Sequence, residues 1–341
     1  MSSDAAAAVS PAIGLTTDAD LAVRRMALRL GFGVTLGYLL GGLWGTTLFF
    51  MPPLLAAQFL ATMRQPPGWR DAAGLILVTV LFAALTLTLA GGFVRDPLVY
   101  VLLLGLVLFL GFLLDSAGKT MPASLLLTFA AVIPLAGTQS LELAVGLAGA
   151  IVGAPFIALL ACWVMFAIFP AVPQPDSGSR IARQASPKAA FANTAVLLPL
   201  IVWCMVGGRM SFVLLIVSIA IIRAGRDGGS RAAIGLLLGN VLGGIAATIA
   251  YGVVSMQPSI VFFLLVVLLV GLTFGARIAA GGVLAPLFGV ALMTFLILLG
   301  VGVSPLPIES GEAFGTRLLS VMLAGLYTVG ALSLLPGGRR A

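Results

Sequence analysis

One guanidinium and one carboxylate lie at the edges of long apolar runs, and they carry the most chemical information in this chain. Arg29 follows the start of an apolar run at residue 27, and Asp115 closes the run 97–114. Ionisable side chains in membrane segments are costly and usually mark a substrate or ion path. Arg29 therefore predicts an anion contact, and Asp115 predicts a proton-coupling carboxylate.

Each of these two residues also has an ordinary explanation. Arg29 is close enough to the start of its run for the long side chain to reach the lipid headgroups, as arginine near a helix end usually does. Lys119 follows Asp115 by about one helical turn. The two side chains could therefore form an ordinary surface ion pair. The sequence leaves both alternatives open.

Two adjacent prolines interrupt the run 47–63, and the run 210–222 is unusually short. Proline lacks a backbone donor and clashes with the preceding turn, so Pro52 and Pro53 predict a broken or kinked helix. Short or interrupted segments at matching places of two halves point to a transport site. The alternative is that the prolines only begin a helix after a wide turn. The candidate substrate contacts are Arg29, Pro52, Pro53, Gln58 and Ser211.

The residues that common enzyme and metal chemistry requires are missing. The chain has no histidine, which excludes Ser-His-Asp hydrolysis, histidine-bound zinc and the usual proton shuttle. The two cysteines, Cys162 and Cys204, lie inside apolar runs, which argues against a disulfide framework or a thiolate metal site. With no nucleophile–base pair in the runs, we expect neither an enzyme nor a bound metal or cofactor.

Membrane helices must position these side chains. The 341 residues are 61% hydrophobic and 9% charged, and the mean hydropathy is +1.20, whereas a soluble domain carries about 25% charged residues. A helix needs about 20 apolar residues to cross a bilayer. The apolar runs are 27–45, 47–63, 72–93, 97–114, 121–137, 141–169, 189–206, 210–222, 232–254, 258–275, 281–301 and 313–335. They predict an all-α integral membrane protein with about 12 transmembrane helices.

The lysines and arginines are concentrated in every second loop between these runs. If the N-terminus is cytoplasmic, all of the 18 lysines and arginines except Arg95, Arg209 and Arg317 fall on the cytoplasmic side. This bias predicts a multi-pass protein of the bacterial inner membrane with both termini in the cytoplasm. The cations occur singly or in small groups, which argues against nucleic-acid binding. Residues 1–23 contain no lysine or arginine, so they lack the basic region of a signal peptide.

A polar linker divides the runs into six and six, so both halves enter the membrane from the same side and predict a parallel repeat. The basic loops 64–70 and 223–231 occupy matching positions in the halves, as do the stretches 111–119 and 271–277. The predicted organisation is an N-terminal tail at 1–23, a six-helix repeat at 24–169, the linker at 170–188, a second six-helix repeat at 189–336 and a tail at 337–341.

Glycines at helical spacing predict where helices pack most closely. Gly33, Gly37 and Gly41 lie on one face of the first predicted helix. The same spacing recurs at Gly149 and Gly153, at Gly239 and Gly243, and at Gly271 and Gly275. Small residues four apart let two helix backbones approach, so these positions are expected to be structural and to carry no chemistry.

The beginning of the chain contains the entry Arg25-Met-Ala-Leu-Arg29, a turn containing Trp44, and the segment 48–58 with its Pro52-Pro53 pair. In these features it resembles the fusaric-acid-resistance superfamily, which includes the aromatic acid exporters. The resemblance extends to both halves in layout, because the family's six-helix unit is present twice. Larger members carry a cytoplasmic domain after each unit. This chain has only the linker 170–188, so it is similar to a short, membrane-only branch.

The resemblance implies export of organic or aromatic acids driven by the membrane gradient, beside a periplasmic membrane-fusion subunit. Plant malate channels are similar six-helix units that work as dimers, so this chain would be a fused dimer. We therefore expect an exporter of small aromatic or anionic compounds whose partners are the lipid bilayer and the substrate. A passive anion channel, a non-transporting scaffold for a partner subunit and a homo-oligomer are alternatives that the sequence leaves open.

Overall fold

The computed structural model describes residues 10–45, 48–63, 65–92, 96–171, 185–206, 212–224 and 229–303, with isolated helical residues beyond. Every element in these ranges is an α-helix. They are α1 (Ser10–Leu43), α2 (Met51–Thr62), α3 (Trp69–Gly92), α4 (Pro97–Ser116), α5 (Thr120–Gly137), α6 (Leu141–Ile168), α7 (Pro187–Val206), α8 (Phe212–Ala224), α9 (Gly229–Met256), α10 (Ile260–Ala279) and α11 (Ala285–Val303).

Nine helices in the described part of the chain are long and apolar enough to cross a membrane. The prediction of an all-α, multi-pass membrane protein is therefore confirmed. The full spans predicted at 47–63 and 210–222 are not confirmed, because α2 has 12 residues and α8 has 13. Helices of that length extend about 18–20 Å, against a hydrocarbon core of about 30 Å. The run 313–335 lies largely outside the described residues.

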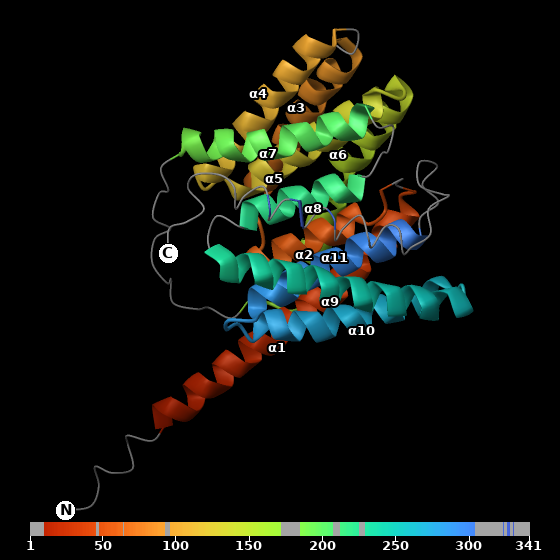
Figure 1. Cartoon of the computed structure of the whole chain (residues 1–341). Coiled ribbons are helices and arrows are strands. Elements are labelled where there is room, and N and C mark those ends of the chain that lie inside the picture. The colour runs from red at the N-terminus through yellow and green to blue at the C-terminus, as the bar shows by residue number, and fades with distance from the viewer. Residues whose placement is uncertain are drawn as a thin grey trace, which may run out of the picture.

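The two halves exchange helices rather than folding side by side (Figure 1). Helix α1 packs against α10, and α7 packs against α4. Helix α2 also contacts α11, and α8 contacts α5. The first helix of each half therefore lies against the fourth helix of the other half, and the second helix against the fifth.

Glycines on α1 create the space that α2 occupies. A Cβ atom at Gly37 would lie 2.7 Å from Pro53 Cα, and one at Gly41 would lie 3.2 Å from Pro52 Cγ. A Cβ at Gly33 would collide with the side chain of Leu60. The predicted close packing on this face of α1 is confirmed, and it leaves nearly every residue of α2 buried.

The other glycine pairs have different outcomes. A Cβ at Gly271 would lie 3.2 Å from Gly31 Cα. A Cβ at Gly275 would lie 3.2 Å from the carbonyl oxygen of Ala27, so α10 and α1 are in close backbone contact. Gly239 and Gly243 likewise lie against α11, whereas Gly149 and Gly153 have no neighbouring atom within 4 Å of an added Cβ. The predicted packing role fits every pair except the last.

The adjacent prolines begin a helix and do not break one. Helix α2 starts at Met51, and Pro52 and Pro53 occupy its first turn. The first four N–H groups of a helix have no partner within the helix, so proline loses no hydrogen bond there and its fixed φ suits the position. The predicted kink in the run 47–63 is therefore wrong, and the alternative of a helix start is correct.

Positive side chains gather at one end of the molecule, which we call the basic end. It is the end where α1 enters the helix assembly and α6 leaves it, and Arg25 Nη1 donates to the carbonyl oxygen of Pro170 there at 3.2 Å. Following the alternating helices, the lysines and arginines with described side chains all lie toward this end. They are Arg24, Arg25, Arg29, Arg70, Lys119, Lys188, Arg223 and Arg277. At the opposite end, Asp96 directly precedes α4 and Glu142 lies in the first turn of α6.

The α1–α2 contact can be tested with one added methyl group. We expect Gly37→Ala to destabilise the protein by about 1–3 kcal/mol, the usual cost of overpacking, because the new Cβ would meet the backbone of Pro53. Gly42→Ala on the same helix is the matched control, since an added Cβ there has no atom within 4 Å. Thermal unfolding of the detergent-solubilised protein measures both. Equal melting temperatures for the two variants would contradict the packing described here.

Candidate functional site

Arg29 is buried inside the helix assembly and does not extend to solvent. Its exposed fraction is 7%. Within the described part of the chain, its Nε and Nη1 atoms have no hydrogen-bond partner. The guanidinium carbon lies 4.5 Å from the centroid of the Phe166 ring on α6. A desolvated cation–π contact is worth about 2 kcal/mol, which offsets only part of the cost of burying an unpaired charge.

Three helices meet around Arg29. Leu60 of α2 and Met165 of α6 fill the space beside Gly33, one turn along α1 from Arg29. Helix α2 runs antiparallel to α1 and ends at Thr62, which is exposed. The neighbours of Gly33 thus place α2 and α6 beside the turn of α1 that follows Arg29.

This arrangement suits a small organic anion. An arginine presents planar N–H donors that match the geometry of a carboxylate and can bind it through two parallel hydrogen bonds. Two of these nitrogens on Arg29 are free of protein partners in the described part of the chain. The Phe166 ring is 5% exposed and gives the guanidinium an aromatic, apolar neighbour.

The structure does not gather the predicted substrate contacts into one place. Pro52 and Pro53 lie against Gly41 and Gly37, which are two to three turns of α1, about 12–18 Å, from Arg29. Gln58 is half-buried on α2, and in the described part of the chain no hydrogen bond joins it to Arg29. Ser211 lies outside the described residues. Of the four predicted contacts that the structure describes, Arg29 is the one whose surroundings fit an anion.

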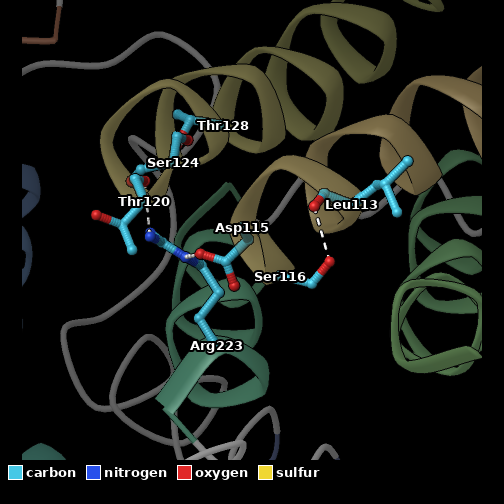
Figure 2. Close-up of polar contacts among 7 residues, drawn as sticks. All are labelled: Leu113, Asp115, Ser116, Thr120, Ser124, Thr128 and Arg223. Atoms are coloured by element: carbon cyan, nitrogen blue, oxygen red, sulfur yellow. Dashed lines mark hydrogen bonds and ion pairs between the residues drawn. The ribbon is translucent and has the colours of Figure 1, made fainter. Parts of the chain in front are cut away.

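Asp115 forms an ion pair with the other half of the chain. Its Oδ1 atom accepts a hydrogen bond from Arg223 Nε of α8 at 3.0 Å (Figure 2). The side chains of Asp115 and Arg223 are 6% and 21% exposed. The alternative pairing with Lys119 is therefore wrong, and Lys119 is exposed. This carboxylate, in the last turn of α4, thus joins α4 to α8.

Further polar contacts surround this ion pair. Arg223 Nη2 also donates to the carbonyl oxygen of Thr120, the first residue of α5, at 2.8 Å. Ser116 Oγ donates to the carbonyl oxygen of Leu113 at 2.7 Å and accepts the backbone N–H of Ser186 at 3.1 Å. The end of α4 and the start of α5 are thus tied to the start of α7 and the end of α8, all at the basic end.

Sequence reasoning missed several polar and aromatic partners. In the sequence, Phe166 is one aromatic residue among many and Arg223 is one of several loop cations. Nothing in their spacing identifies them as partners of Arg29 and Asp115. Thr294 Oγ1 donates to Asn240 Oδ1 at 2.6 Å between α11 and α9, and these polar residues inside apolar runs were a readable signal. Asn193 Nδ2 and Ser218 Oγ are buried without a partner in the described region.

Comparison of the chain with known protein families, with characterised proteins and with solved structures gives no significant match. The candidate site is therefore identified from the geometry of its residues alone.

The burial of Arg29 without hydrogen-bond partners for two of its nitrogens in the described part of the chain predicts that the protein does not need this side chain for stability. We expect Arg29→Met to leave the thermal stability unchanged or to raise it, because an unsatisfied buried polar group costs about 1–3 kcal/mol and methionine has a similar length. Arg25→Met is the matched control, one turn away, which loses the bond to Pro170. A large loss of stability in Arg29→Met alone, measured by thermal unfolding in detergent, would show that Arg29 supports the fold.

Proposed function

We propose that this chain is a secondary exporter of small organic anions, aromatic carboxylates among them, in the bacterial inner membrane. One observation carries the proposal: Arg29 is 7% exposed, and two of its nitrogens have no partner in the described part of the chain. Residues that are costly for stability and whose cost is only partly offset by contacts are typical of functional sites. An anion that visits Arg29 supplies the missing contact, and Phe166 favours one with an apolar body.

We also propose that the halves are a parallel six-plus-six repeat and that the basic end faces the cytoplasm. The exchanged pairs α1–α10 and α7–α4, and α2–α11 and α8–α5, are the contacts that a two-fold relation between halves would produce. The short helices α2 and α8 also occupy the same position in each half, as expected of the discontinuous segments at transport sites. The gathered lysines and arginines support the orientation, because cytoplasmic loops of membrane proteins are enriched in them.

Asp115 is the residue that we assign to proton coupling. It is the carboxylate whose side chain is buried at the contact between the halves. A buried carboxylate that can exchange an arginine partner for a proton links protonation to the separation of two helices. A periplasmic membrane-fusion subunit as partner is supported by the family resemblance alone.

Transport of labelled aromatic acids tests this function. We expect cells that contain the protein to export at least one acid of the panel, and export to fall about tenfold or more in Arg29→Gln, since a charge-assisted hydrogen bond contributes about 1.5–3 kcal/mol. Arg25→Gln is the matched control, because Arg25 bonds to Pro170 and leaves Arg29 in place. An equal loss of export in both variants would show that export depends on positive charge in general, and it would contradict an anion site at Arg29.

The same assay separates coupled export from passive flow. Each chain is measured with and without a protonophore, and Asp115→Asn is added to the set. Export that stops with the protonophore and in Asp115→Asn supports proton coupling. Flux that ignores both and follows the concentration gradient supports a channel. No protein-dependent flux of any acid would overturn the transport proposal and favour a scaffold.

A further inference from the structure

Several contacts join the halves of the chain, and two of them are built from different chemistry. Helices α1 and α10 meet through glycines, with Gly271 and Gly275 so close to Gly31 and Ala27 that a Cβ would lie about as near as real Cβ atoms allow. Such a contact depends on many short van der Waals distances, and parting the helices even slightly loses most of that energy. We therefore regard α1–α10 as the contact that stays closed.

The contact at the basic end of α4, α5 and α8 depends on charge. Arg223 of α8 reaches both the carboxylate of Asp115 on α4, at 3.0 Å, and the carbonyl oxygen of Thr120 on α5, at 2.8 Å (Figure 2). A single side chain therefore holds α8 to two helices of the other half. Figure 2 shows the guanidinium group lying between Asp115 and the first turn of α5.

Such a contact can be broken and remade in water. The Arg223 side chain is 21% exposed, whereas that of Asp115 is 6% exposed, so the carboxylate gains water only when α8 moves away from it. A buried carboxylate that loses its partner is costly unless water or a proton reaches it, so separation of the pair and hydration of Asp115 occur together. Moreover, α8 is a helix of 13 residues that buries less surface than a full span, so its displacement disturbs fewer contacts.

The matching position in the other half lacks this chemistry. The stretch 271–277 aligns with 111–119, and Gly275 stands where Asp115 stands. Gly275 lies directly against Ala27 and Leu30 of α1. A carboxylate at one position and a tight glycine contact at the other make the two contacts between the halves unequal.

We propose that the Asp115–Arg223 ion pair is a latch that closes the contact between α4–α5 and α8, and that the protein opens there while α1–α10 stays closed. The role of this opening in a transport cycle rests on the proposed function. The opening itself does not, and it can be measured without any substrate.

Ser218 is a suitable probe of the opening. It lies on α8 about one and a half turns, or about 7.5 Å, before Arg223. Ser218 is fully buried, and its Oγ atom has no partner in the described region. Ser218→Cys therefore changes size little and breaks no hydrogen bond. Cys162 and Cys204 are buried, and the chain without Ser218→Cys measures their background reaction.

The experiment measures how fast a hydrophilic maleimide labels the purified full-length chain with Ser218→Cys. We expect slow labelling in this chain and a rise of about tenfold when Asp115→Asn or Arg223→Gln is added, which corresponds to 1.4 kcal/mol. The double exchange Asp115→Arg with Arg223→Asp should return labelling toward the slow rate. Lys119→Gln, in the exposed turn beside Asp115, is the matched control and should leave the rate unchanged.

Three outcomes would overturn the latch: unchanged labelling in both single variants, equally fast labelling in Lys119→Gln, or fast labelling that the double exchange does not slow. Gel filtration establishes that each chain is folded. If the single variants do not fold, the double exchange decides, because a folded and slowly labelled chain shows that the two charges act as a pair. The assay contains no transported compound, so failure of the export proposal would leave its result unchanged.

Discussion

The absence of water in a bilayer core is the constraint on which the rest of this structure depends. Backbone N–H and C=O groups cannot be left unpaired against lipid, so a helix that ends within the core must end inside protein. Helix α2 has 12 residues, and its first turn, which contains Pro52 and Pro53, is buried. The glycines of α1 at positions 33, 37 and 41 make room for it. Without this face of α1, the short helix would have no place to lie.

Contacts between the halves connect the packing of α2 on α1 to the rest of the molecule. Each half contributes its first two helices to the neighbourhood of the other half's fourth and fifth helices. The same connectivity holds two chemically unequal contacts, one of glycines and one of charges, so the two sides of the molecule need not respond alike to a force that separates the halves.

Much of the fold could be predicted from the sequence, because its signals are periodic or compositional. Apolar runs predict helices in the membrane, and glycines four apart predict close contacts, which are present at Gly37 and Gly271. The helix lengths were less predictable. The run 47–63 looks like a short span, yet the prolines set the helix start at Met51, since proline fits the first turn better than any later one.

The site was less accessible to sequence reasoning for a physical reason. Whether Arg29 reaches lipid headgroups or stays buried depends on which helix covers it, and α6 covers it with Phe166. Asp115 likewise had a local partner in Lys119, but the preferred partner is Arg223, a residue 108 positions away. Ionic partners act over short distances in space whatever their separation in sequence, so only the fold could choose between them.

The one-sided distribution of charge has an electrical consequence for the molecule as a whole. The basic end carries the described lysines and arginines, while Asp96 and Glu142 lie at the other. In a membrane with a potential that is negative inside, each elementary charge gains about 2.3 kcal/mol per 100 mV by lying on the inner side. The voltage therefore favours the orientation proposed above, with the basic end toward the cytoplasm. In the proposed direction of transport, the same field acts outward on a singly charged anion released from Arg29.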